Sequence, residues 1–442
     1  MTRITDNSLE TPRETKHKFL VAKPYYSGFE LAHDTYNAIS AASDGKIYYV
    51  LSSESYDTGG KMYVYDPLTD KTSFLADLTE ICGEKDMKAI PQGKSHVRFY
   101  ESNGKLYFVT HVGVYEMIDG MERLPERAPQ GYELYPGGHI ISYDLATGEF
   151  EDLALAPYGE GLLTMTIDKQ REHIYTLTWP LGYFLDFNLA TGELKNLGLP
   201  CGKGEGGTVG EDYRVICRSM FVDPRDGTVY FSTGEGNILY YRPGMASFEK
   251  LESIDLKLDY FGEYDPTRPG SMGYNWRKIF WHEGQAAAYG VHGNSGYLFR
   301  FDPLKPEIEI VDRIASAPSK RSGMFDQFSY GYLGFQPGPD GETIYYLTGG
   351  PIYIDGKRLK GADQIAKGAA KGLENLHLIT YHIPTNHYID HGPVFYPDGS
   401  RPTYVNSIAI GDDGSVYTLA RFDYEGNEIQ DLIKIPDPFA NS

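Results

Sequence analysis

Short runs of alternating apolar and polar residues recur along the whole chain, each after a polar turn that contains glycine or a close substitute. Such alternation is typical of a β-strand with one buried face, and the turn joins that strand to the one before it. Five copies are clear and two are weaker: SDGKIYYVLS (43–52), SNGKLYFVTH (102–111), RDGTVYFSTG (225–234), DGETIYYLTG (340–349), DGSVYTLAR (413–421), KQREHIYTLTW (169–179) and GQAAAYGVHG (284–293). The pattern predicts seven pairs of antiparallel strands.

A second element follows most copies, a strand that ends in a turn with Asp-Pro, Thr-Gly or a related pair. It also occurs seven times: 62–70, 140–148, 184–192, 238–244, 297–304, 378–385 and 432–438. Two counts of seven predict an all-β fold, a seven-bladed β-propeller with four-stranded blades, because such sheets bury their faces by stacking radially. We expect a single domain over 1–442, with a tail at 1–17 and a closing strand at 18–26. An Ala-rich segment, 351–376, is predicted to be a loop with a short helix.

Composition agrees with this fold and limits the partners. The chain has 37 Tyr and 50 Gly residues, as expected of many short strands joined by tight turns. Its net charge of −20 argues against nucleic acid and anionic membranes as partners, although a local basic pocket can still bind an acidic sugar. Three scattered cysteines form no disulfide framework. With no signal peptide or long apolar run in view, we expect a cytoplasmic protein.

The repeat also predicts which side chains meet at one end of the central channel. Residues eight before and seven after each turn glycine lie opposite that turn, at what we call the channel mouth. The residues expected there, allowing for longer turns in some blades, are Asn37, His96, His111, Trp179, Arg218, Arg277, Asn406, Arg421 and a tyrosine near Tyr330. His292 falls one residue short of the same offset.

This set has recognisable chemistry. Arginine pairs with carboxylate or sulfate groups, and a neutral histidine accepts a proton near physiological pH. Together with a tyrosine, these groups suit β-elimination next to a uronic acid. Paired carboxylates of a glycosidase are less visible, because the candidates Glu235 and Asp326 miss the offsets of the mouth, and this mildly disfavours a two-carboxylate glycosidase.

The residues of blade two, GKSHVRFYESNGKLYFVTHVGVY, followed by YPGGHIISYDLATGEFEDL and GEGLLTMTID, resemble the propeller polysaccharide lyases. That group includes ulvan lyases and the lyases and rhamnosidases that act on rhamnose–glucuronate linkages. The resemblance implies an acidic oligosaccharide or polysaccharide substrate, with His96 and His111 as the catalytic pair and Arg218 neutralising the carboxylate. It also implies a divalent ion such as Ca²⁺ or Zn²⁺, for which the sequence shows no ligand set.

The catalytic tyrosine is harder to place, since Trp179 stands at the comparable position; Tyr183, Tyr274 and Tyr330 are alternatives. We predict catalytic roles for His96, His111, Arg218 and Tyr330. Substrate contacts are predicted for Asn37, Trp179, Tyr274, Arg277, His292, Asn406 and Arg421. A propeller hydrolase using one histidine, a non-catalytic binding propeller and a six-bladed lactonase-type propeller stay open as alternatives.

Overall fold

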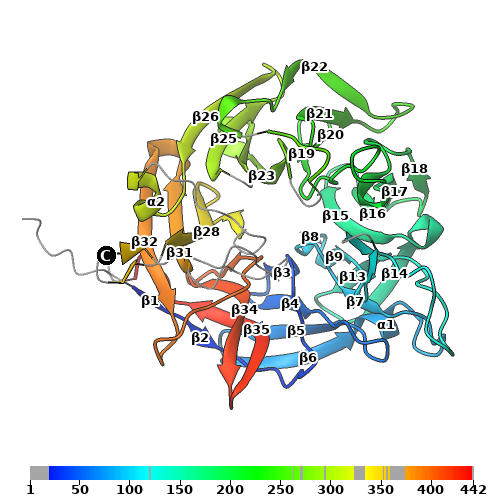
Figure 1. The fold of residues 1–442 in the computed structure, drawn as a ribbon, viewed down its shortest axis with the longest axis horizontal. Helices are drawn as coiled ribbons and strands as arrows, with labels where there is room; N and C mark the ends of the chain where they lie inside the picture. Colours follow the sequence, from blue (N-terminus) through cyan, green and yellow to red (C-terminus); the bar gives the residue numbers. More distant parts are fainter. Residues whose placement is uncertain are drawn as a thin grey trace, which may run out of the picture.

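The computed structural model is a seven-bladed β-propeller, in which seven sheets surround a central channel (Figure 1). It describes residues 19–118, 121–261, 263–268, 272–292, 295–322, 334–351, 353–354, 357–358 and 374–440. The predicted fold class is therefore confirmed. The expected tail at 1–17 and Tyr330 lie outside the described residues.

Each blade is an antiparallel sheet whose first strand lies innermost. Blade one contains β3 (Ile39–Ala41), β4 (Ile47–Leu51), β5 (Lys61–Asp66) and β6 (Lys71–Asp77). Blade two contains β8 (Tyr100–Ser102), β9 (Lys105–Val109), β13 (His139–Asp144) and β14 (Phe150–Leu155). Blade three contains β15 (Gly161–Asp168), β16 (His173–Trp179), β17 (Phe184–Asn188) and β18 (Leu194–Asn196). Blade four contains β19 (Phe221–Asp223), β20 (Thr228–Ser232), β21 (Asn237–Tyr241) and β22 (Glu249–Asp255).

Blade five contains β23 (Trp276–His282), β24 (Ala287–His292), β25 (Tyr297–Asp302) and β26 (Glu307–Arg313). Blade six contains β27 (Phe335–Pro337), β28 (Thr343–Pro351), β31 (Glu374–His382) and β32 (His387–Phe395). Blade seven contains β33 (Ala409–Ile410), β34 (Val416–Tyr424), β35 (Asn427–Ile435) and the N-terminal β2 (Lys23–Pro24). The two repeated sequence elements thus form the second and third strands of the blades.

The N-terminal segment closes the ring, as predicted, and it also reaches the neighbouring blade. β2 pairs antiparallel with β35, and the blue strand lies beside the red one in Figure 1. Just before it, β1 (Leu20–Val21) pairs in parallel with β32 of blade six. The predicted strand was assigned to the last blade alone. The structure instead places the residues before Ala22 in the sheet of blade six and those after it in the sheet of blade seven.

A tyrosine of the glycine-turn repeat is buried in every blade. These side chains are at most 8% exposed: Tyr48, Tyr107, Tyr175, Tyr230, Tyr289, Tyr345 and Tyr417. Each comes from a second strand, where a large flat ring fills the space between neighbouring sheets. Burial of this kind explains why tyrosine is so frequent in the chain.

Elements outside the blades are few in the described part of the chain. Two short helices are present, α1 (Leu78–Ile81) and α2 (Ala317–Ser322), and neither is long and apolar enough to cross a membrane. The prediction of a loop with a helix at 351–376 is wrong for the residues that can be described there. They belong to strands: the end of β28, β29 (Tyr353–Ile354), β30 (Lys357–Arg358) and the start of β31. The remainder of that segment lies outside the described residues.

Candidate functional site

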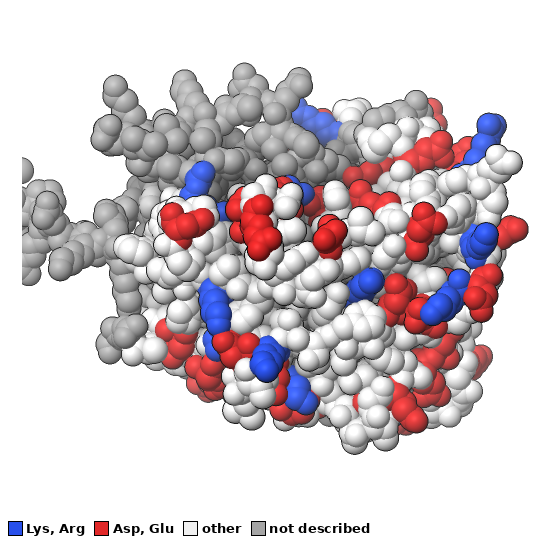
Figure 2. All heavy atoms as spheres, turned by 90° about the horizontal axis from the view of Figure 1, so that it is seen from below, with Lys and Arg blue, Asp and Glu red and all other residues white. Residues whose placement is uncertain are grey.

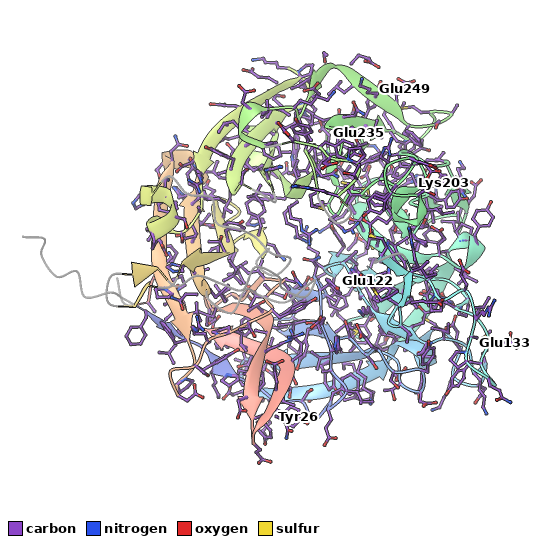
Figure 3. The ribbon with its side chains drawn as sticks, viewed as in Figure 1. Tyr26, Glu122, Glu133, Lys203, Glu235 and Glu249 are labelled. Atoms are coloured by element: carbon purple, nitrogen blue, oxygen red, sulfur yellow. The ribbon has the colours of Figure 1, made fainter. Side chains whose placement is uncertain are left out.

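A small pocket lies where the sequence places the channel mouth, and we call it the mouth pocket. It has a volume of about 70 Å³. Its polar and aromatic lining is Asp34, Tyr36, Asn37, Glu54, Lys94, His96, His111, Tyr115, Glu122, Trp179, Glu205, Arg218 and Arg277. In Figure 3 the label of Glu122 lies on the inner side of the ring, whereas that of Glu133 lies on the outer side.

A two-stranded ribbon at the inner end of blade two carries His111. It consists of β7 (Gln92–Lys94) and β10 (His111–Val112), and His111 pairs with Lys94 across it. The ribbon packs so tightly that a Cβ atom at Gly113 would lie 2.0 Å from the carbonyl oxygen of Ser53. A Cβ at Gly161 would lie 2.8 Å from the His111 ring. Both glycines are needed for close approach, which holds the imidazole in one place.

The hydrogen bonds of His111 define its tautomer. Nδ1 donates to the carbonyl oxygen of Val112 at 2.9 Å, so the ring proton sits on Nδ1. Nε2 is buried and none of the described residues hydrogen-bonds it, which leaves its lone pair available. Burial lowers the pKa of His111 to about 3, and the charges of Lys94 and Arg218 act in the same direction. The imidazole is therefore neutral at physiological pH.

His96 lies directly against His111. The two ring centres are 4.4 Å apart, and on its other side His96 stacks on Tyr36 at 4.3 Å. Its Nε2 atom is also buried with no hydrogen-bond partner among the described residues. Burial lowers the pKa of His96 well below its ordinary value, and His111 with the cations Lys94, Arg218 and Arg277 adds to this shift. The pair is thus held neutral by one desolvated, positive environment.

Glu54 holds the buried Lys94 beside the two histidines. Lys94 is 1% exposed, and its Nζ lies 3.1 Å from Glu54 Oε1 and 4.5 Å from the centre of the Tyr115 ring. Although burial raises the pKa of Glu54, His33 and Lys94 hold it at about 2, so this carboxylate is ionised. Burial lowers the pKa of Lys94, and the ionised Glu54 beside it opposes that shift and so favours the charged form of the lysine on the ribbon next to His111.

On the opposite side of the pocket, the carboxylate of Glu205 binds both Arg218 and Trp179. Its Oε1 accepts from Arg218 at 2.6 Å, and its Oε2 accepts from the Trp179 indole at 3.0 Å. The Trp179 ring in turn packs on His111, with 5.2 Å between the ring centres. Glu205 belongs to the loop GKGEGG (202–207), so this loop supplies an anchor for a guanidinium and an indole.

The structure brings most of the predicted residues together. Those lining the mouth pocket are Asn37, His96, His111, Trp179, Arg218 and Arg277. Arg421 does not line the pocket itself but pairs with Asp34, which does. Asn406 is 2% exposed, and neither amide atom has a hydrogen-bond partner among the described residues, but it does not line the pocket.

Tyr274 and His292 are not brought to the pocket. The ring nitrogens of His292 lie 2.7 Å from Ser295 Oγ and 3.0 Å from the carbonyl oxygen of Gly273, and its ring stacks on Phe261. Tyr274 packs at the edge of the core between blades four and five. These two side chains pack locally instead. The longer turns of blades four and five shift the offset from the turn glycine at which a residue reaches the mouth.

Sequence reasoning missed the ion-paired carboxylates at the mouth. The repeat offsets pointed to none of them, yet Asp34, Glu54, Glu122 and Glu205 all line the pocket. Tyr36 and Tyr115 were missed as well. The sequence offered one indication for each, its closeness to a predicted site residue. Tyr36 precedes Asn37, and Tyr115 lies four residues after His111. Glu235, the carboxylate considered beforehand, instead pairs with Arg214 at 2.6 Å.

The described residues do not fit the divalent ion that the family resemblance implies. Nowhere in the part of the chain that the structure describes do three His, Cys, Asp or Glu side chains form a metal-binding group. The two histidines of the mouth pocket face lysine and arginine, and Glu54 and Glu205 are bound to those cations. Since no such group is found among the described residues and these two carboxylates pair with Lys94 and Arg218, we assign no metal to this pocket.

Comparisons with known proteins support the fold. No family model and no curated protein matches the chain. A chain of the mitotic checkpoint complex is 10% identical with a TM-score of 0.50, over 99% of this chain and 98% of that one. Oligogalacturonate lyase in complex with manganese is 14% identical with a TM-score of 0.48, over 96% and 98% of the two chains. A putative 6-phosphogluconolactonase from Bacteroides uniformis is 14% identical with a TM-score of 0.46, over 89% and 93%. Similarity at this level concerns the propeller and assigns no activity.

Proposed function

We propose that the protein is a lyase that cleaves a glycosidic bond next to a uronic acid by β-elimination. One observation carries the proposal: two neutral histidines, each with an unpartnered buried Nε2, lie among Lys94, Arg218 and Arg277. Four carboxylates, Asp34, Glu54, Glu122 and Glu205, line the same pocket, and the chain as a whole has a net charge of −20. Figure 2 shows acidic side chains spread among basic ones over the outer wall of the ring.

The cations suit the carboxylate of the uronic acid. Arg218 is held in place by Glu205, and Arg277 is only 6% exposed in the same lining. A guanidinium in a site with little water binds a carboxylate strongly and in a fixed orientation. Neutralising that carboxylate makes the proton on C5 of the sugar more acidic, which is the first requirement of the elimination.

His111 is the proposed base. Its Nε2 lone pair takes the C5 proton, the electrons of that C–H bond form the C4–C5 double bond, and the C4–O bond breaks. The pKa of the free imidazole is low partly because of Lys94 and Arg218, and a bound carboxylate offsets those charges. Substrate binding therefore makes His111 more basic when a base is needed.

Tyr115 is the proposed acid. Burial raises the pKa of this phenol well above its ordinary value, so it carries its proton at physiological pH. Its ring lies 6.2 Å from the His111 ring and 5.4 Å from Trp179, on the pocket side of the ribbon. The phenol gives its proton to the leaving oxygen, and the proton on His111 later restores the phenol.

The substrate extends beyond the mouth pocket, because about 70 Å³ is too little for a sugar ring. A larger cavity of about 340 Å³ follows along the channel and shares Asn37, His96 and Arg218 with the pocket. The second volume is within the range of small-molecule sites. We place the saccharide across both cavities.

A hydrolase with two carboxylates is less well supported. Such enzymes need one protonated carboxylic acid, with a raised pKa, opposite a second carboxylate. At the mouth, Glu54 has a pKa of about 2 and Glu205 is bound to Arg218, so neither is suited to donate a proton. Asp34 likewise pairs with Arg421. Of the acid–base groups in the lining, we assign the chemistry to a histidine and a tyrosine.

The test is a panel of uronate-containing polysaccharides incubated with the wild-type protein. We expect the ultraviolet absorbance of an unsaturated uronate to appear, and mass spectrometry to find products without an added water. The matched control is the same polysaccharide with its carboxyl groups reduced to alcohols, which should not be cleaved. Products that carry an added water identify a hydrolase instead, and no cleavage across the panel contradicts the proposal.

A further inference from the structure

The channel cavity behind the mouth pocket carries positive charge of its own. Among its lining residues are Arg98 of blade two, Lys169 of blade three and Lys278 of blade five. None of these three forms an ion pair with any residue that the structure describes. On the outer surface, by contrast, Lys195 lies 3.6 Å from Glu193.

Lys278 is the central member of this group. Its Nζ donates to Asn37 Oδ1 at 2.6 Å, which joins blade five to blade one across the channel. Asn37 in turn donates to the backbone oxygen of His96 at 3.1 Å, so the ammonium lies next to the mouth pocket. The neutral amide of Asn37 replaces only part of the hydration that Lys278 loses on burial. An anion bound beside the ammonium would stabilise its charge further.

Arg98 lies close enough to affect both lysines. Burial lowers the pKa of Lys278 well below its ordinary value, and Arg277 and Arg98 lower it further. The pKa of Lys169 is also lowered, by burial first and then by Arg98. The Arg98 guanidinium itself rests on the Tyr100 ring, 4.7 Å from its centre. The cations therefore form one repelling group along the channel.

Two carboxylates line the same cavity without removing this excess. Asp168 is bound by Arg171 at 3.1 Å and accepts from the backbone of Gln170 and Arg171. Glu283 belongs to the 3₁₀ turn η4 (Glu283–Gln285), at the end of the inner strand opposite the mouth. Neither carboxylate pairs with Lys278, so an anion bound beside it would favour the charged form of this amine, which burial and its basic neighbours disfavour.

We propose that the channel cavity is a second anion site, in which Lys278 and Arg98 bind the carboxylate or sulfate group of the sugar next to the one whose carboxylate enters the mouth pocket. The identity of the anion as part of a saccharide rests on the proposed function. The substrate class narrows accordingly to linear saccharides with acidic groups on neighbouring units. Such a ligand gains two ionic contacts, one at each cavity.

Calorimetry with three probes tests this site: inorganic sulfate, glucuronate, and a linear disaccharide of two uronates. All titrations use His111→Gln protein, which prevents turnover, with and without Lys278→Met or Arg98→Met. Lys195→Met, which removes a charge from an exposed lysine, is the matched control. Thermal unfolding of each variant verifies the fold.

We expect Lys278→Met to weaken sulfate and disaccharide binding by ~10-fold, the usual loss for one charge-assisted hydrogen bond. Glucuronate, which is held at the mouth, should change by less than about twofold, since it needs only one of the two sites. Unchanged sulfate affinity in both channel variants overturns the anion site. Loss of sulfate binding with unchanged disaccharide affinity shows a site for free anions and overturns the assignment to the substrate.

The lyase proposal can fail separately. If the wild-type protein cleaves no uronate glycan while sulfate binding still depends on Lys278, the channel site stands and the proposed reaction does not. If cleavage occurs but neither Lys278 nor Arg98 affects the affinity for any probe, the reaction stands and the second site is wrong.

Discussion

His111 and His139 both lie in blade two, and their strands touch. The backbone N–H of Thr110 donates to the carbonyl oxygen of His139, and both imidazoles are nearly inaccessible. Their surroundings are opposite. His111 keeps an unpartnered nitrogen among cations, whereas His139 lies between two carboxylates, 2.8 Å from Glu84 and 2.9 Å from Asp152.

This difference separates a reactive histidine from a structural one. Burial alone lowers the pKa of His139, but the hydrogen bonds to Asp152 and Glu84 raise it to about 9, so the ring is charged and fully paired. His111 is neutral and keeps a lone pair for a ligand or a proton. A buried histidine with both nitrogens paired stabilises the fold, and one with an open nitrogen beside a pocket is available for chemistry.

The largest effect is expected from His111→Gln. The amide has no basic lone pair, so kcat/KM on a cleaved uronate glycan should fall by at least about 100-fold. The midpoint of thermal unfolding should stay close to that of the wild type, because glutamine can still bond the Val112 carbonyl. His139→Ala provides the comparison, and its folded fraction should retain kcat/KM within about threefold. Equal losses of activity in the two variants would remove the distinction drawn here.

The next effect is expected from His139→Ala, on stability. Glu84 is 4% exposed, and without His139 it keeps the amide of Gln92 but has no cation among the described residues. Removing one partner of a buried ion pair costs about 3 kcal/mol, which urea unfolding measures as a lower midpoint. His387→Ala, at an exposed position of β32, is the matched control and should leave the midpoint unchanged. A similar midpoint for both variants contradicts a structural role of His139.

The smallest effect concerns pH. The pKa of His139 is raised to about 9 from about 6.5 in the unfolded chain, so its contribution is fully present below pH 6.5 and is lost as the pH rises through 9. We expect the free energy of unfolding of the wild type to decrease by about 2 kcal/mol more than that of His139→Ala between pH 6.5 and 9.5. Unfolding curves in urea at several pH values measure this difference. Parallel pH profiles for the two proteins would contradict it.

The sequence predicts the ring well because each blade repeats the same local rules. Alternation, a polar turn and a buried tyrosine recur seven times, so one error in a blade does not change the count. The same register predicted that His96, His111, Arg218 and Arg277 converge, since His96, Arg218 and Arg277 lie on or just before inner strands and His111 follows the second strand β9. Tyr330 lies outside the described residues, and its role stays a prediction.

The other residues of the site stand at positions that the repeat offsets do not predict. Lys94 belongs to the ribbon strand β7 before β8, Tyr115 lies three residues after β10, and Glu205 belongs to a loop that follows blade three. Loops of this kind contact the mouth through tertiary packing, which turn spacing cannot predict. His292 shows the converse, because its offset was nearly right but a hydrogen bond to Gly273 turns its ring away from the pocket.

The closing strand has a consequence for how the chain folds. β2 finds its partner in β35, and the registered residues Lys23 and Lys434 come from opposite ends of the described chain. During synthesis the first strand therefore has no place in any sheet until nearly all of the protein has emerged. Contacts between such distant segments form slowly and leave strand edges exposed meanwhile. We expect blades one to five to form before closure, with the joining of blades six and seven as the late step.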